Sequence, residues 1–182
     1  MNKKGQIILL VSMLAAFAFM LAFAMFFDYL MVSPRVSTDE YNFILQENSR
    51  LADTILQPGV PLNWDRDTVL KIGIVDGNIL NTTKAEYFED LSREDHVDQT
   101  GYEEGKTLLG LFYEYLIIIE KENDILYSIG DYIDLGITEG SIEEDDLVGS
   151  NPAAISIQER TVLHRDEGRL VPVKIKIYTY KK

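Results

Sequence analysis

The clearest periodic signal in the chain lies in residues 37–56, which read STDEYNFILQENSRLADTIL. Ser37 and Glu40 are spaced as a capping box, a pattern that begins a helix. Apolar residues then recur at steps of three and four, the spacing of one helical face, at Tyr41, Ile44, Leu45, Leu51, Ala52 and Ile55. The other face is polar and carries Asp39, Glu40, Asn42, Glu47 and Arg50. We therefore expect an amphipathic helix over about 38–56 that packs its apolar stripe on a sheet.

Two pairs of strand-like segments are expected to form that sheet. Residues 113–119 and 125–129 are rich in β-branched and aromatic side chains and flank a polar connection, so we expect a hairpin. The run Leu116 to Ile119 is typical of a strand covered on both faces, one by the helix and the other by a neighbouring subunit or by residues 131–150.

Residues 154–164 and 169–180 predict a second hairpin. In its last strand the alternation predicts a buried face of Val171, Val173, Ile175 and Ile177. The same alternation predicts a wet face of Lys174, Lys176, Tyr178 and Tyr180. Pro172 suits an edge strand or the first residues of a strand, because proline donates no ladder hydrogen bond.

The middle of the chain predicts shorter elements. We expect a rigid turn at residues 58–61, a strand over 68–75, a short helix over about 83–92 and a loop over 93–105. Trp64 is expected to be a buried anchor of the turn, because its ring brings a large apolar area to a core. The sequence therefore predicts an α+β fold with an antiparallel sheet of about four or five strands.

Composition excludes several classes of function. The 182 residues carry 17 basic and 30 acidic side chains, a net charge of −13, and nonspecific nucleic-acid binding needs a basic face instead. The chain has no cysteine, which excludes disulfides, thiol catalysis and zinc–cysteine sites. No catalytic or nucleotide-binding motif occurs, so we expect no enzyme activity and no cofactor.

An apolar run of 21 residues, relieved only by Ser12, extends from Ile7 to Phe27. As a helix it would rise roughly 31 Å, close to the ~30 Å core of a bilayer. We therefore expect a transmembrane helix over residues 6–32 in contact with the lipid bilayer. Lys3 and Lys4 precede the run, which predicts an N-terminus inside the cell and a single-pass chain whose C-terminal part lies outside.

Three fates are open for this segment. It is a permanent signal anchor, a secretory peptide cleaved at Ala22-Phe23-Ala24, or a segment processed between Gly5 and Gln6. The secretory reading is disfavoured, because the apolar run continues through residues 25–27 and exceeds the usual length of ~7–15 residues. The third fate would remove Lys3 and Lys4 and keep the whole apolar run.

The stretch Lys3-Lys4-Gly5-Gln6 followed by Ile7-Ile8-Leu9-Leu10 resembles the type III signal peptide of archaeal type IV pilins and pilin-like proteins. The resemblance implies cleavage by a prepilin peptidase after Gly5, and partnership with other pilin subunits and their assembly machinery. It implies a leader of residues 1–5, an assembly helix of residues 6–32, an amphipathic helix of residues 33–57 and an extracytoplasmic head of residues 58–182. The glutamate that bacterial pilins carry at the fifth mature position is Leu10 here.

A second, more diffuse resemblance is to archaeal exported proteins with pilin-type N-termini. It rests on residues 57–64, which read QPGVPLNW, on residues 69–74, on Ile79-Leu80-Asn81 and on Lys84. The function expected from both resemblances is a minor subunit of a type IV filament or related surface appendage. The alternative is a permanently membrane-anchored external domain that binds a ligand or another protein.

Two further kinds of site are open. Asn81-Thr82-Thr83 matches an N-glycosylation sequon, although Asn81 also suits a helix cap. The acidic residues of segment 139–146 are candidate calcium ligands, because they supply many oxygens. A charge run is more commonly a solvated face, and the same holds for Asp95, His96 and Asp98, so we expect no metal at either place.

Overall fold

The computed structural model describes residues 13–25, 37–93, 100–131 and 142–182. The chain divides into two compact units, Met1–Arg35 and Val36–Lys182. In the first unit a helix covers residues 13–25. The predicted transmembrane helix over residues 6–32 is contradicted: within the described ranges, no helix is long and apolar enough to cross a membrane.

The second unit is built on one six-stranded sheet in the order β1-β2-β5-β6-β3-β4. The strands are β1 (Val75–Asp76), β2 (Ile79–Leu80), β3 (Glu114–Lys121), β4 (Asp124–Gly130), β5 (Ala154–Asp166) and β6 (Arg169–Lys181). β2 runs parallel to β5, and the other paired strands are antiparallel. The expected sheet of four or five antiparallel strands is thus corrected to a mixed sheet of six. The two missed strands are two residues each, too short to show an alternation.

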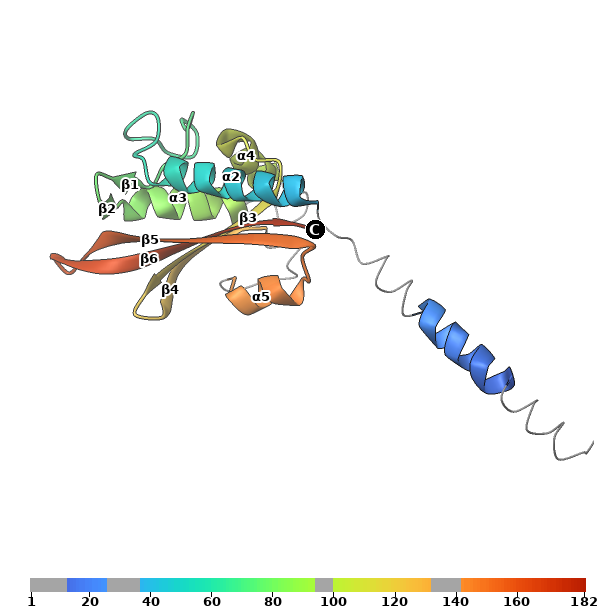
Figure 1. Cartoon of the computed structure of the whole chain (residues 1–182). Coiled ribbons are helices and arrows are strands. Elements are labelled where there is room, and N and C mark those ends of the chain that lie inside the picture. The colour runs from blue at the N-terminus through green and yellow to red at the C-terminus, as the bar shows by residue number, and fades with distance from the viewer. Residues whose placement is uncertain (1–12, 26–36, 94–99, 132–141) are drawn as a thin grey trace, which may run out of the picture. The chain divides into compact units, whose positions relative to one another are not determined.

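Helices cover both faces of this sheet (Figure 1). One face carries α2 (Thr38–Ile55), α3 (Thr82–Arg93) and α4 (Thr100–Leu109), and the other carries α5 (Glu144–Gly149). The predicted helices over 38–56 and 83–92 are confirmed. The predicted loop over 93–105 is wrong at residues 100–105, which begin α4.

Strand β3 is buried on both faces, as its apolar run predicted. Tyr115, Ile117 and Ile119 belong to the larger core beneath α2 and α3. Leu116 and Ile118 belong to a smaller core on the opposite face, together with Ile142, Leu147, Tyr178 and Tyr180. The sequence predicted that either a neighbouring subunit or residues 131–150 would cover this second face of β3. In the structure Ile142 and Leu147, which belong to residues 131–150, pack against it.

That smaller core corrects one prediction about β6. Val173, Ile175 and Ile177 are buried as expected, but Tyr178 and Tyr180 are buried too, at 1% and 0% exposure. They point to the predicted wet face, which α5 covers at this end of the strand. Pro172 lies in β6 opposite Leu163 of β5, beyond the part of β6 that pairs with β3, so its missing amide breaks no ladder hydrogen bond.

Helix α2 begins as its sequence predicts, with the Ser37 hydroxyl accepting a hydrogen bond of 3.2 Å from the Glu40 amide. The buried face differs from the expected stripe. Tyr41 and Leu45 are exposed, whereas Glu47 and Asn48 are buried. Asn48 is held by hydrogen bonds to the backbone oxygens of Ser156 (2.7 Å) and Ile177 (3.2 Å), so its amide ties the helix to β5 and β6.

The predicted strand over 68–75 is wrong apart from Val75, which opens β1. Residues 66–68 form a turn, and Lys71 makes an isolated bridge with Val60. The Trp64 prediction is confirmed: its ring is 2% exposed, and its Nε1 donates to the Gly73 carbonyl at 2.9 Å.

Candidate interaction surface

Several predicted site residues lie outside the described residues. The processing motif Lys3, Lys4, Gly5 and Gln6 is among them, as are Asp95, His96 and Asp98 and the first part of the acidic segment, residues 139–141. The candidate site described below is therefore built from the second unit alone, Val36–Lys182, which is called the head from here on.

An exposed cluster of rings, here called the aromatic surface, lies near the start of α2. It consists of Phe43, Phe112 and Tyr113. Phe43 is 46% exposed and Phe112 is 77% exposed. The Phe43 ring centroid lies 6.1 Å from that of Phe112 and 6.0 Å from that of Tyr113. Rings at these separations attract one another, so the cluster is a preformed apolar surface in contact with water.

Polar contacts below the rings hold the surface together. The buried carboxylate of Glu47 accepts hydrogen bonds from the backbone amides of Phe112 (2.7 Å) and Tyr113 (3.0 Å). Arg50 donates to the Gly110 carbonyl, and Gly110 adopts a left-handed conformation that favours glycine. Two turns of α2 thus fix the α4–β3 loop, and with it the position of Phe112.

A hollow of about 190 Å³ lies beside the two phenylalanine rings. Its lining consists of Phe43, Gln46, Glu47, Arg50 and Phe112. Pockets that bind small molecules usually measure about 300–1,000 Å³, so this hollow is small for a cofactor or metabolite. Its size and apolar walls suit one side chain of a protein partner, the arrangement that anchors many protein–protein contacts.

A second exposed apolar group, here called the apolar loop, follows the other end of α2. It presents Val60, Leu62 and Leu70, of which Leu62 is 72% and Leu70 is 74% exposed. Backbone hydrogen bonds of 2.9 Å join Val60 to Lys71 and Leu70 to Val60. The loop is therefore a rigid platform with its aliphatic side chains outside.

The base of the apolar loop requires glycine. Gly59 has a φ of +78°, and a Cβ placed there would lie 2.4 Å from Nε1 of Trp64. At Gly73 an added Cβ would lie 2.2 Å from the Gln57 carbonyl oxygen. Along the loop, the hydrogen bond from the Thr68 hydroxyl holds the pKa of Asp65 below its ordinary value.

Asn81 lies in the same region and caps α3. Its Oδ1 accepts from the Lys84 amide at 3.1 Å, and its Nδ2 donates to Asp76 at 2.8 Å. The buried Lys84 ammonium contacts the Pro58 carbonyl (2.6 Å) and Asp76 (3.0 Å). Partial burial alone would raise the pKa of Asp76, but the bonds from Asn81 and Lys84 outweigh it and lower that pKa. Glycosylation of Asn81 stays a prediction, and it would use the nitrogen that now donates to Asp76.

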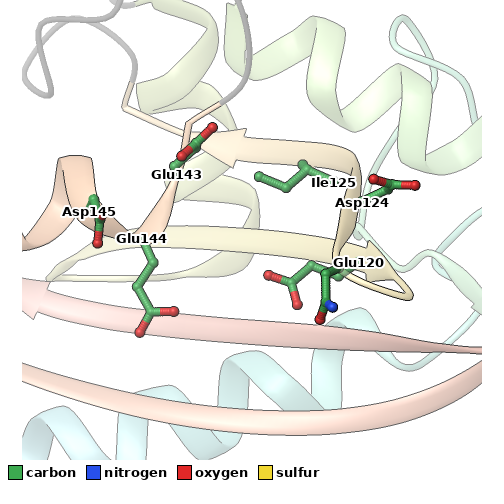
Figure 2. Close-up of a pocket in the computed structure, with 7 residues that line it drawn as sticks. Glu120, Asp124, Ile125, Glu143, Glu144 and Asp145 are labelled. Atoms are coloured by element: carbon green, nitrogen blue, oxygen red, sulfur yellow. The ribbon is translucent and has the colours of Figure 1, made fainter.

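An acidic hollow of about 480 Å³ lies on the α5 side (Figure 2). Its lining consists of Glu120, Asn123, Asp124, Ile125, Glu143, Glu144 and Asp145. The labelled carboxylates are spread around the opening and do not converge on one point. Lys176 pairs with two of them, Glu120 at 2.9 Å and Glu144 at 3.3 Å. Within the described part of the chain, no three side chains are grouped to hold a metal ion.

Comparison with known proteins gives no identification. No protein-family model, no curated protein and no solved structure matches the chain.

Reasoning from the sequence missed the aromatic surface. Phe43 lies off the apolar stripe, on the face that was expected to be polar, and Phe112 is 69 positions away in a connection between elements. An isolated phenylalanine on the polar face of a helix was the available signal. The sequence pattern placed Glu47 on the polar face of the helix and gave no sign that its carboxylate would be a buried hydrogen-bond acceptor.

Proposed function

We propose that the chain is a pilin-like protein, a minor subunit of an archaeal type IV filament or a related surface appendage. The observation that carries the proposal is the stretch Lys3-Lys4-Gly5-Gln6 placed directly before the apolar run of Ile7 to Phe27. In this proposal a prepilin peptidase cuts after Gly5, the acidic remainder is outside the cell, and the function is assembly.

The chemistry of the apolar run supports an assembly role. At about 25 cal/mol per Å² of buried apolar surface, covering such a segment is worth on the order of tens of kcal/mol against water. The segment therefore needs an apolar cover, which the same segment of other copies would supply in an assembled filament. Removing Lys3 and Lys4 leaves the apolar run without the two charges that precede it.

The head contributes further support. It presents exposed apolar side chains on rigid supports at the aromatic surface and the apolar loop, and such groups mark interaction sites more than catalytic ones. The proposed partners are the prepilin peptidase, the other subunits, and an assembly ATPase with its membrane platform.

The deciding experiment is the mass of the mature chain, expressed with and without a prepilin peptidase. We expect a chain that begins at Gln6 only when the peptidase is present. A Gly5→Leu variant should stay uncut, whereas the matched Asn2→Leu variant should be processed normally. An intact Lys3-Lys4 terminus in the presence of peptidase would refute the proposal in favour of a permanently anchored domain, and a chain that begins at Met25 would indicate a secreted protein.

A further inference from the structure

We propose that the head pairs with a second copy of itself along an open edge of its sheet, so that the two β5 strands lie antiparallel to each other. The paired stretch is residues 155–161, and the Gln158 residues of the two copies lie opposite each other on the two-fold axis. The inference goes beyond the proposed function and does not rest on it, because it uses only backbone groups and side chains of the head.

One side of β5 is fully paired and the other is covered at one end only (Figure 1). β5 pairs with β6 in one continuous register from Ala154 to Asp166. On its other side β2 meets β5 at Leu163, whose amide donates to the Asn78 carbonyl at 2.8 Å. Alternate residues of a strand turn their backbone groups to the same side. The backbone groups that point away from β6 ahead of Leu163 are therefore those of residues 155, 157, 159 and 161.

This part of the edge has little other cover. In the part of the chain that the structure describes, these four outward amides make no hydrogen bond to a protein group. The Glu159 carbonyl accepts a bond of 3.1 Å from the guanidinium of Arg160, an exposed contact that an incoming strand can replace. The opposite edge of the sheet is protected, because at β4 the Ser128 amide donates to the Glu89 carboxylate of α3 at 3.0 Å. An open row of amides and carbonyls is a template for another strand.

The open stretch is complementary to itself in one antiparallel register. With Gln158 on the axis, Ile155 of each copy pairs with Thr161 of the other. Ile157 pairs with Glu159 in the same way, so every outward amide and carbonyl gains a partner. A register centred on residue 159 would set Glu159 against Glu159, and like charges directly opposite destabilise a sheet. A register centred on residue 157 would set Thr161 against residue 153, which precedes the strand.

The ends of the stretch also fit this register. β5 begins at Ala154, which would lie opposite Val162 of the second copy. The cover by β2 begins at the next residue, Leu163. The incoming strand therefore begins where the cover by β2 stops, and the two do not compete for the same edge.

Apolar side chains flank the open edge on both faces of the sheet. Ile157 is 50% exposed and lies on the same face as Ile155, which packs against the smaller core. On the other face, Gln158 donates to the Ser49 hydroxyl of α2 at 2.7 Å. Leu45, one turn before Ser49, is 38% exposed. A second strand would cover part of both apolar side chains, which adds apolar burial to the backbone hydrogen bonds.

Single cysteines test the register in the full-length chain, which has no cysteine of its own and would be purified in mild detergent. Residues opposite each other at a non-hydrogen-bonded position have Cα atoms about 4.5 Å apart, within the range of a disulfide. Gln158→Cys occupies such a position against its own copy, so oxidation should give a dimer and no larger species.

The neighbouring positions are matched controls. Ile157→Cys and Glu159→Cys are each displaced by two residues from the same position in the other copy. Either variant alone should therefore give about a tenth or less of the dimer from Gln158→Cys. A mixture of the two variants should link, because Ile157 of one copy then lies opposite Glu159 of the other.

Proline tests the backbone hydrogen bonds. Ile157→Pro removes an outward amide and no bond to β6, so the head should keep its stability in urea unfolding followed by Trp64 fluorescence. Added to Gln158→Cys, it should lower the dimer yield about tenfold or more, because the two-fold axis makes one substitution remove two bonds. Ile157→Ala keeps the amide and should lower the yield less. Thr161→Pro removes another outward amide and serves as the test if Ile157→Pro unfolds the head.

Three outcomes would overturn the proposal. The first is the absence of a dimer from Gln158→Cys, and the second is a dimer of equal yield from Ile157→Cys or Glu159→Cys alone. The third is a Gln158→Cys dimer whose yield is unchanged in a folded chain that carries either proline. The mature N-terminus of the same samples reports on the leader and not on this edge, so the two proposals fail separately.

Discussion

Replacing Glu47 with alanine is expected to lower the free energy of unfolding by about 3 kcal/mol. The Glu47 carboxylate is 4% exposed and accepts hydrogen bonds of 2.7 and 3.0 Å from the amides of Phe112 and Tyr113. Hydrogen bonds to a charged group contribute about 1.5–3 kcal/mol each. We take the lower value for each bond, because Phe112 is exposed and water can partly replace the lost acceptor.

The assay is urea unfolding followed by the fluorescence of Trp64, the single tryptophan of the chain, which is buried in the native state. Glu47→Gln keeps one acceptor oxygen without the charge and should cost about half as much as Glu47→Ala. Asp53→Ala, an exposed acidic residue on the same helix, is the matched control and should change stability by less than about 0.5 kcal/mol. A loss below about 1 kcal/mol for Glu47→Ala, or an equal loss for both substitutions, would refute the reasoning.

Two other predictions follow from the same structure. Leu147→Ala should lower the free energy of unfolding by about 2–5 kcal/mol in the same urea assay, because the fully buried Leu147 covers the second face of β3. The lowered pKa of Asp76 means that its contribution to stability is present above its ordinary pKa of 3.8 and is lost as pH falls through its lower native pKa. Asp76→Asn should therefore flatten the acid limb of a stability–pH profile, and an unchanged limb would contradict the assignment.

The elements that the sequence predicted correctly are those with local causes. Ser37 begins α2 because its hydroxyl reaches an amide three residues away. The hairpin of β3 and β4 turns at Glu122 and Asn123, where a polar pair with φ values of 52° and 80° sits between two apolar strands. Such signals lie within a few residues of the structure that they produce.

The predictions that the structure corrects concern residues whose burial or pairing depends on distant parts of the chain. Tyr178 and Tyr180 are buried only because α5 covers the face of β6 that their alternation assigned to water. Strands β1 and β2 form because β2 pairs with β5, where Ile79 lies opposite Leu163. Each of these strands has two residues, too few to show a periodic pattern in the sequence. The hollow lined by Phe43 and Phe112 brings together residues 69 positions apart, so only the folded chain could show it.

The charge of the chain would oppose a broad polar contact between two copies. Two copies of net charge −13 repel one another, and such an interface would bring many carboxylates together. Several basic side chains are already paired within the head: Lys84 pairs with Asp76, Lys106 with Glu114, Lys121 with Asp166 and Lys176 with Glu120. If copies assemble as proposed, the exposed apolar side chains on rigid supports therefore suit their contact better than the charged faces do.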